Sequence, residues 1–563
     1  MLKMSGAKAL VKALRDEKVD KIFGVIGGAI MPVYDEFIDS GIRPIRMSHE
    51  QGAGHAADGY ARVLGFPGVC MGTSGPGATN LVTGVATAYM DSSPVIAITG
   101  QVNYYSPNTP YMIGRDAFQE IDAVAIMTPI TKYVFQPKKV RDVPSTVRSA
   151  FAIAMHGRPG PVHIDLPKDV QTGEDEVDDS RILVSLRPIP EPKIDEVKRV
   201  ASLLLNAQRP VILAGGGVIW SGASEELLKV AELLLAPVIT TFMGKGAIPE
   251  NHPLSIGVIG MHGNSVANRV TREADVILAV GTRFSDRSVG TLDTFAPEAR
   301  IIHIDIDRSE IGKNVSPHIG IVGDAKRVLG MLYDTMLSLA KKSPERWEWV
   351  RKLRKEAEAV RDEREDTGFT AKKVLRILRK IVPGNAIITT EVGQNQMWAS
   401  LYFDIYEPRT FLSSGGLGTM GSGFPMAIGA KVARPDRFVM DIAGDGSFKM
   451  NEKELATTVL ENIPVTVVIL NNHMLGMVAQ WQRMFYDYRY IGVELENIPD
   501  FEKLAKAYGA EGFRVDSPQE LEKAIKFVLG SEVSVVMDVS IHPEEDVLPF
   551  VPPGKGLHEV IEK

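Results

Sequence analysis

The feature of this sequence that most constrains its fold is a repeated alternation of short, β-branched apolar runs with longer segments of helical periodicity. The runs at Pro94–Thr99, Pro210–Gly217 and Val465–Asn472 are almost continuously apolar. Such runs are typical of strands buried on both faces, which occur in parallel sheets covered by helices. We therefore expect an α/β protein with mostly parallel sheets.

Breaks in this alternation divide the 563 residues into three blocks, which we expect to be three doubly wound domains. The first covers residues 1–170, and a charged, proline-rich linker follows at 171–193. The second covers 194–340. A charged helical segment at 341–366 then connects it to the third block at 367–563.

Composition and charge exclude several classes of protein. The chain carries 63 Lys and Arg against 70 Asp and Glu, a net charge of −7, so it offers no basic surface for nucleic acid or an anionic membrane. Its one cysteine, Cys70, allows neither an internal disulfide nor a cysteine-built metal site. No apolar stretch predicts a membrane span, and Ser5 looks like the N-cap of a first helix rather than part of a signal peptide. We expect a cytoplasmic protein.

The most informative segment is RFVMDIAGDGSFKMNEKELATTVLENIPVTVVILNN, residues 437–472. It predicts a strand, a Gly444–Ser447 turn, a helix through about Leu460 and a second strand that ends at Asn472. Ligands of such βαβ units bind beyond the carboxyl ends of the strands. Gly444 and Gly446 allow a close backbone approach, and the helix start offers N–H groups to a diphosphate. Asp445 and Asn472 offer the hard oxygen ligands that Mg²⁺ prefers.

This segment resembles the motif of thiamine-diphosphate enzymes, which runs from GDG to NN. The resemblance implies the three-domain architecture of that family, with an N-terminal pyrimidine-binding domain, a central domain and a C-terminal diphosphate-binding domain. It also implies that Mg²⁺ is bound by Asp445, Asn472 and the Met474 carbonyl. The implied cofactor contacts are Gly444, Gly446, Ser447 and Gln394.

A second segment of that family begins at SHEQGAGHAADGYAR. Ser48 as N-cap and Gln51 three residues into the helix predict a capping box, which by itself explains a glutamate in the first turn. The resemblance gives Glu50 a catalytic role, because in the family this carboxylate hydrogen-bonds the aminopyrimidine ring of the cofactor and activates it. The Gly-rich stretch Ser413–Ala430 resembles the family's segment in which a bulky residue, here Met420, holds the cofactor in its bent form.

Narrower motifs resemble acetohydroxyacid (acetolactate) synthase, and they follow the family order through all three blocks: Gly114–Glu120, Gly157–Val170, Gly260–Gly263, Gly281–Arg287, Glu391–Ala399 and Leu475–Tyr486. The resemblance implies condensation of pyruvate with pyruvate or 2-ketobutyrate, with loss of carbon dioxide. The products would be 2-acetolactate and 2-aceto-2-hydroxybutyrate, precursors of valine, leucine and isoleucine.

The same resemblance assigns roles to individual residues. Phe118 and Gln119 would surround the first pyruvate, Trp481 would favour a 2-ketobutyrate side chain, and Arg287 would hold the carboxylate of the second keto acid. Lys168, Met261 and Val478 would line the access channel. The family also carries FAD in its central domain, and the matching positions are Arg158, Gly215, Gly216, Thr241, Gly281, Arg283, Asp305 and Asp324.

Three places depart from the family pattern: Ser285 replaces a usual Asp near the FAD residues, Ala479 replaces a usual Arg beside Trp481, and NYYS at residues 103–106 replaces the usual segment after Gln101. The resemblance further implies a homodimer or tetramer with the active site between subunits, and a separate small regulatory subunit.

Three alternatives stay open. The first is another thiamine-diphosphate enzyme, of the pyruvate oxidase or sulfoacetaldehyde acetyltransferase type. The second is a catalytically silent relative with a regulatory role. The third is a simple Rossmann oxidoreductase, which would need a GxGxxG fingerprint that the sequence lacks.

Overall fold

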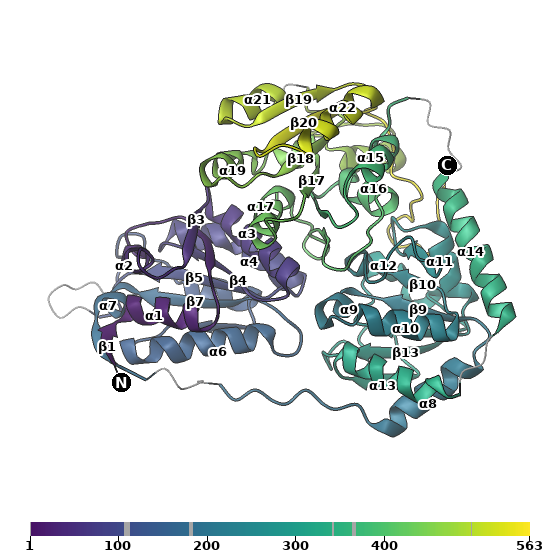
Figure 1. Cartoon of the computed structure of the whole chain (residues 1–563), viewed down its shortest axis with the longest axis horizontal. Coiled ribbons are helices and arrows are strands. Elements are labelled where there is room, and N and C mark those ends of the chain that lie inside the picture. Colours follow the sequence, from purple (N-terminus) through teal and green to yellow (C-terminus); the bar gives the residue numbers. More distant parts are fainter. Residues whose placement is uncertain are drawn as a thin grey trace.

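The computed structural model of the chain describes residues 2–105, 113–178, 184–339, 343–362, 368–496 and 498–562. Parts of the predicted linker at 171–193 and of the predicted connecting segment at 341–366 lie outside the described residues. The expected α/β class is confirmed, because the structure contains three six-stranded parallel sheets, each flanked by helices. Figure 1 shows the first domain in purple and blue, the second in teal beside it, and the third in green and yellow above both.

The N-terminal sheet has the strand order β3-β2-β4-β5-β7-β6. Its strands are β2 (Lys21–Gly24), β3 (Arg43–Arg46), β4 (Gly68–Gly72), β5 (Val95–Gln101), β6 (Tyr133–Phe135) and β7 (Val162–Pro167). Its helices are α1 (Gly6–Asp16), α2 (Met31–Glu36), α3 (Glu50–Leu64), α4 (Pro76–Met90), α5 (Ala123–Met127), α6 (Val143–Met155) and α7 (Lys168–Thr172), with 3-10 turns η1 (Thr128–Ile130) and η2 (Val140–Asp142).

The middle sheet has the order β11-β10-β9-β12-β13-β14, in which the direction of winding reverses between β9 and β12. Its strands are β9 (Pro210–Ala214), β10 (Val238–Thr240), β11 (Ser255–Val258), β12 (Val276–Val280), β13 (Arg300–Asp305) and β14 (Ile319–Val322). Its helices are α8 (Ile194–Asn206), α9 (Gly216–Ser221), α10 (Ser224–Leu234), α11 (Ser265–Glu273), α12 (Asp286–Val289), α13 (Ala325–Leu337) and α14 (Pro344–Asp362), with η3 (Phe242–Gly244) and η4 (Leu292–Thr294).

The C-terminal sheet has the order β16-β15-β17-β18-β20-β19. Its strands are β15 (Ile387–Thr390), β16 (Phe411–Leu412), β17 (Val439–Gly444), β18 (Thr466–Asn471), β19 (Glu511–Val515) and β20 (Val535–Ser540). Its helices are α15 (Ala371–Ile381), α16 (Gln394–Tyr402), α17 (Gly423–Ala433), α18 (Asp445–Phe448), α19 (Leu455–Glu461), α20 (Gly476–Phe485), α21 (Phe501–Tyr508) and α22 (Pro518–Val528), with η5 (Glu452–Glu454).

The N-terminal and C-terminal domains share one core through α3 and α17, whose buried alanines and aromatic residues belong to a single cluster. The two helices come close because glycines lie at the crossing. A methyl group at Gly59 would lie 2.2 Å from the Met426 carbonyl oxygen, and one at Gly429 only 1.8 Å from the Ala56 oxygen. This contact fixes the start of α3, with Glu50, relative to the loops of the C-terminal sheet.

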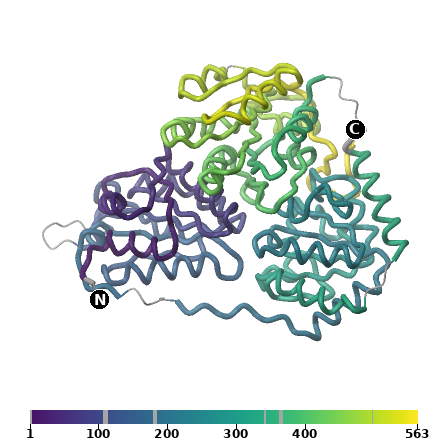
Figure 2. The backbone as a smooth tube through the Cα atoms, viewed as in Figure 1, coloured from purple at the N-terminus to yellow at the C-terminus, as the bar shows by residue number. Residues whose placement is uncertain are grey.

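Two long excursions of the chain tie the domains together. Residues 184–193 run along the lower edge from the first domain to the second (Figure 2). The C-terminal segment returns to the middle domain, where Gly556 forms an antiparallel bridge with Gly290, next to α12. No helix within the described ranges is both long enough and apolar enough to cross a membrane.

Three local predictions are wrong. Part of the predicted linker forms β8 (Glu174–Val177), which pairs antiparallel with β1 (Leu2–Ser5). Ser48 is not the N-cap of α3: His49 takes that position, and its Nδ1 accepts from the Gln51 N–H at 3.1 Å. The turn predicted at Gly444–Ser447 overlaps a four-residue helix, α18. The helix predicted to follow it, through about Leu460, is broken into η5 and α19, since the chain turns at Asn451, whose buried amide donates to the Gly421 carbonyl.

Candidate active site

A cavity of about 780 Å³, which we call the main cavity, lies where the three domains meet, at the carboxyl ends of β9 and β12. This is the point at which the winding of the middle sheet reverses, the usual ligand position of a doubly wound fold. The cavity is lined from all three domains, with Arg158 of the first, Arg283 and Arg287 of the second, and Met420 and Trp481 of the third.

The glycines after β9 and β12 let two loops pack backbone against backbone. A methyl group at Gly215 would lie 2.1 Å from the Gly281 carbonyl oxygen, and the Gly217 N–H donates to that oxygen at 3.0 Å. Gly281 also has a φ of +59°, which favours glycine. Gly215 is therefore explained by loop packing, whereas its neighbour Gly216 lines the cavity.

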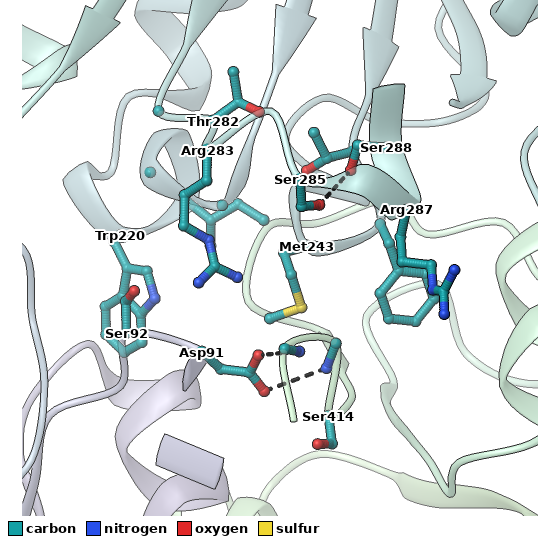
Figure 3. Close-up of a pocket in the computed structure, with 18 of the residues that line it drawn as sticks. Asp91, Ser92, Trp220, Met243, Thr282, Arg283, Ser285, Arg287, Ser288 and Ser414 are labelled. Carbon is teal, nitrogen blue, oxygen red and sulfur yellow. Dashed lines mark hydrogen bonds between the residues drawn. The ribbon is translucent and has the colours of Figure 1, made fainter. Parts of the chain in front are cut away.

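Charged side chains at this end of the cavity are partly paired. Arg158 Nη1 contacts Glu310 Oε1 at 2.8 Å and its Nε donates to Ser92 Oγ at 2.7 Å. Arg283 points into the centre of the cavity in Figure 3. Burial and the nearby Arg158 lower its pKa. Burial raises the pKa of Asp305 to about 6. A buried cationic centre with incomplete pairing suits an anionic ligand such as a phosphate.

The remaining predicted FAD positions have structural roles of their own. Thr241 caps η3 through the Gly244 N–H, and Asp324 caps α13 and accepts from Ser221 Oγ at 2.7 Å. Both still line the cavity. Ser285, the residue that departs from the family, precedes α12, and its Oγ lies 3.3 Å from that of Ser288 (Figure 3).

A buried ion-pair cluster under the cavity was not predicted. Arg62 bridges Asp58 and Asp91 at 2.7 and 2.9 Å, and Asp91 accepts from the N–H groups of Gly415 and Gly416 (Figure 3). This cluster holds the loop before Met420. The i, i+4 spacing of Asp58 and Arg62 could have suggested their pair, but the long-range partner Asp91 has no sequence signal.

The predicted substrate residues from the middle and C-terminal domains come together. Arg287, Trp481, Met261 and Val478 all line the cavity. The Arg287 side chain is 57% exposed, and the Met261 N–H donates to its carbonyl at 2.8 Å. The Trp481 Nε1 is buried with no recorded partner among the described residues. His262, which was not predicted, also lines the cavity, and burial together with Arg287 lowers its pKa to about 3.

A second group of polar residues lies at the carboxyl ends of β15, β17 and β18, outside this cavity. Asp445 follows β17 and Asn472 follows β18, as predicted. Asp445 Oδ1 accepts from the Gly446 N–H at 2.8 Å, but its buried Oδ2 has no hydrogen-bond partner in the part of the chain that the structure describes. Burial raises the pKa of Asp445 to about 7. A buried carboxylate oxygen without a partner is the environment that a bound cation would satisfy.

The Met474 backbone contacts this group through its N–H, which donates to Asn472 Oδ1 at 3.3 Å. Met474 forms an antiparallel bridge with Glu494. The hydrogen bonds of this bridge lie on either side of Met474: the Leu475 N–H donates to the Val493 carbonyl, and the His473 carbonyl accepts from the Leu495 N–H. In such a bridge the carbonyl of the middle residue points away from the partner strand. Because α18 has only four residues, the helix dipole at this site is that of a single turn.

Met420 is fixed from both sides of its loop. After it, Glu391 Oε2 accepts from the Gly421 N–H at 2.7 Å and Oε1 accepts from the Phe424 N–H at 3.0 Å. Before it, the loop is held by Asp91, as described above. Met420 itself lines the cavity.

A third group surrounds Glu50 at the start of α3. Glu50 is 8% exposed, and its Oε2 accepts from Asn80 Nδ2 at 2.9 Å. The N–H groups of Ser48 and His49 donate to Glu454, a buried residue of η5, at 3.0 and 3.1 Å. Asn80 and Glu454 were not predicted.

The other predicted residues of the first domain lie away from the main cavity of the chain. Gln119 has a φ of +59° and lies against Gly75, at the start of α4. Phe118 is 88% exposed. Lys168 begins α7. Glu50, Phe118, Gln119 and Lys168 do not line the cavity within the part of the chain that the structure describes.

Comparison with known families matches three models along the chain. The thiamine pyrophosphate enzyme N-terminal TPP binding domain matches residues 4–126, the central domain matches 197–332, and the C-terminal TPP binding domain matches 391–539. These ranges fall on the three sheets described above.

Full-length relatives are similar throughout. The chain is 51% identical to a probable acetolactate synthase large subunit of Methanocaldococcus jannaschii, covering 99% of this chain and 95% of the relative. It is 49% identical to a probable acetolactate synthase large subunit of Methanococcus aeolicus, with the same coverage. It is 42% identical to the acetolactate synthase large subunit of Corynebacterium glutamicum, covering 99% and 90%.

Proposed function

Because this chain belongs to the thiamine pyrophosphate enzymes, and within them to the family of acetolactate synthase large subunits, we propose that it condenses two 2-keto acids with loss of carbon dioxide. Pyruvate is the donor, and pyruvate or 2-ketobutyrate is the acceptor. The products are 2-acetolactate and 2-aceto-2-hydroxybutyrate, precursors of valine, leucine and isoleucine. The observation that carries this proposal is that Trp481 and Arg287, from two different domains, line one cavity.

Arg287 binds the carboxylate of the acceptor keto acid. Its guanidinium is accessible, and its recorded ion pair, to Asp286, is long at 3.6 Å. A planar guanidinium fits a carboxylate with two parallel hydrogen bonds. Trp481 forms the apolar wall for the acceptor side chain, where one extra methylene is worth about 1–3 kcal/mol. Met261 and Val478 complete the channel beside it.

Asp445, Asn472 and the Met474 carbonyl hold Mg²⁺ between the protein and the diphosphate group. The unpartnered Oδ2 of Asp445 supports this assignment. Within the described residues, no three His, Cys, Asp or Glu side chains gather as a metal site. One carboxylate, one amide and one carbonyl suit Mg²⁺, which takes its other ligands from phosphate and water. Gly444, Gly446 and Ser447 would contact the diphosphate, and Gln394, the first residue of α16, would do so through its backbone N–H.

Thiamine diphosphate, when bound, supplies the electron sink for decarboxylation and carbon–carbon bond formation. Glu50 would hydrogen-bond the aminopyrimidine ring of the bound cofactor and act there as the acid–base group. The carboxylate is shielded from water and oriented by Asn80, as a general acid–base group requires. Met420 packs against the cofactor and holds it bent.

The active site is completed by a second copy of the chain. The recorded side-chain hydrogen bond of Glu50 is to Asn80 of its own domain, and the Asp445 group belongs to the C-terminal sheet. In a homodimer or tetramer, Glu50, Phe118, Gln119 and Lys168 of one subunit face the Asp445 group of another. This arrangement accounts for the position of these four residues outside the main cavity.

FAD occupies the main cavity. The middle sheet has the order in which dinucleotides bind where the winding reverses, and the cavity lies at that point. Arg158 and Arg283 would face its phosphates, and Gly216, Thr241, Gly281, Asp305 and Asp324 would surround the rest of the cofactor, with Gly215 holding the Gly281 loop in place. Because the relatives are named large subunits, a small regulatory subunit is the expected partner.

The test is turnover of pyruvate by the purified protein with thiamine diphosphate, Mg²⁺ and FAD, with identification of the products, alongside Glu50→Gln. We expect acetolactate that depends on thiamine diphosphate and falls at least about 100-fold in Glu50→Gln, the typical contribution of a general acid–base group. Acetaldehyde, acetyl phosphate or no product from the wild-type protein would reject the proposed reaction.

A further inference from the structure

Four residues form a buried chain of hydrogen bonds from the Asp445 group to the helix of Trp481. Asn472 Nδ2 donates to Gln394 Oε1 at 3.0 Å, and Gln394 Nε2 donates to Gln480 Oε1 at 3.0 Å. Gln480 then exchanges two hydrogen bonds with the Val547 backbone, donating to its carbonyl at 3.1 Å and accepting from its N–H at 2.9 Å. We call Asn472, Gln394 and Gln480 the amide relay.

The relay is buried along its whole length. Asn472 and Gln394 are 4% exposed, and Gln480 is fully buried. A buried amide whose partner is lost leaves an unsatisfied polar group, which is costly. The local sequence makes room for the relay: a methyl group at Gly476, the first residue of α20, would lie 2.0 Å from Gln394 Oε1 and 2.6 Å from Asn472 Nδ2. A residue larger than glycine there would break it.

The relay fixes the orientation of every amide in it. The Val547 backbone offers both a donor and an acceptor, so Gln480 can satisfy both only with its Oε1 toward the N–H. That oxygen then accepts from Gln394 Nε2, which also donates to the Glu545 carbonyl at 2.9 Å. Gln394 Oε1 is left to accept from Asn472 Nδ2. The amide oxygen of Asn472 is therefore directed away from the relay, where it accepts from the Met474 N–H at 3.3 Å and where a cation could use its second lone pair.

We propose that Gln480 is a positioning residue that acts through Gln394 to orient Asn472, and that it couples the metal end of the site to the helix that carries Trp481. The coupling rests on the proposed function, because Asn472 is a metal ligand only in that proposal. Residues that orient metal ligands are worth about 10- to 100-fold in metal affinity when they are changed. Gln480 precedes Trp481 directly, so a shift of Gln480 moves the wall of the acceptor pocket as well.

The experiment compares Gln480→Met with Gln482→Met. The control lies on the same helix, but Gln482 bonds to the backbone of Ile491 and not to the relay. Mg²⁺ affinity is measured by calorimetry in the presence of thiamine diphosphate, without substrate. The product ratio is measured with pyruvate and 2-ketobutyrate in competition.

For Gln480→Met we expect Mg²⁺ affinity to fall at least about tenfold and the acceptor ratio to shift by about threefold, a fraction of the discrimination that one methylene supports. Gln482→Met should change neither. Gln394→Met should weaken Mg²⁺ binding as well, and the double variant should be no weaker than the weaker single variant, because both changes break one chain of bonds. Gln480→Glu keeps the acceptor toward Gln394 and provides a second variant if Gln480→Met does not fold.

Unchanged Mg²⁺ affinity in Gln480→Met, or additive losses in the double variant, would overturn the relay. A change in the acceptor ratio alone would also overturn it, since Gln480 would then be a pocket residue only. If the wild-type protein makes no acetolactate, the proposed function fails, and the Mg²⁺ measurements alone still decide whether the relay orients Asn472.

Discussion

Two histidines in the first domain are buried so completely that burial is the largest cause of the shift in their pKa. His55 of α3 and His163 of β7 are fully inaccessible. Desolvation lowers the pKa of His55 to about 4 and that of His163 to about 3. Neither ring nitrogen of His55 has a recorded partner among the described residues. Both side chains therefore stay neutral in the folded protein at pH values where an unfolded chain would bind protons.

His55 should make the first domain less stable in mild acid. Its folded pKa lies below its unfolded value, so its contribution is present above pH 6.5 and is lost as the pH falls toward about 4. For His55→Gln, we expect the difference in unfolding free energy between wild type and variant to be about 2 kcal/mol smaller at pH 5 than at pH 7. Thermal unfolding curves at the two pH values measure this. An unchanged difference would mean that His55 binds a proton in the folded state.

Cys70 provides a reporter of opening in the same domain. The thiol is fully buried in β4, and burial raises its pKa to about 12. Because the thiolate is the reactive form, the native protein should resist thiol reagents even at pH 10. Labelling in denaturant should be complete, since this is the single cysteine of the chain. Rapid labelling of the native protein, followed by mass spectrometry, would contradict this burial.

At the scale of elements, apolar content decided what could be predicted. The buried strands β9, β12, β17, β18 and β20 coincide with the continuous apolar runs of the sequence. The strands that were missed are short or polar: β3 reads RPIR, β8 reads EDEV and β19 reads EGFRV. These strands form because a neighbouring strand pairs with them, and the sequence of a single segment contains no signal for that pairing. The cap of α3 was mistaken for the same reason: the Ser48 hydroxyl donates to the Lys453 carbonyl at 3.0 Å, 405 residues away along the chain, and His49 takes the capping position.

Glu454 should be needed for the geometry of α3. In Glu454→Gln, one of the two N–H groups at the start of α3 would face an amide N–H instead of an oxygen. We expect a loss of about 1–3 kcal/mol, the cost of a buried unsatisfied group, seen as a lower urea midpoint, together with lower kcat at unchanged Mg²⁺ affinity. The control is Glu461→Gln, which changes the Arg43 ion pair at the edge of the same interface. Equal effects of the two variants would contradict a special role for Glu454.

At the scale of the whole molecule, the sequence motifs identified the candidate site residues but did not show which of them lie together in space. The Asp445 group was predicted because strand ends of one sheet meet at one edge. The joint lining of one cavity by Arg158, Arg287 and Trp481 depends on how three domains pack. So does the cluster of Arg62 with Asp91. The separate sequence segments contain no information on how the domains pack. The expectations about that packing came from the resemblance to a family.

A shared active site makes a prediction about mixed subunits. Glu50→Gln chains and Asp445→Asn chains should each be inactive alone. Refolded or co-expressed together, they should recover activity, because half of the mixed dimers' sites would combine an intact Glu50 with an intact Asp445. At equal amounts and random pairing, about a quarter of the wild-type sites would be intact, if dimers form by symmetric association. No recovery in purified mixed dimers would place both residues in a site made by one chain.

The first and last sheets are connected in the same way. If the strands of each sheet are numbered along the chain, both read 2-1-3-4-6-5, whereas the middle sheet reads 3-2-1-4-5-6. Two long segments of one chain that share one connectivity point to an ancestral duplication, with a different unit between the copies. In the proposed function, Asp445 and Glu50 would mark how the copies diverged: one would serve the diphosphate and the other the pyrimidine ring.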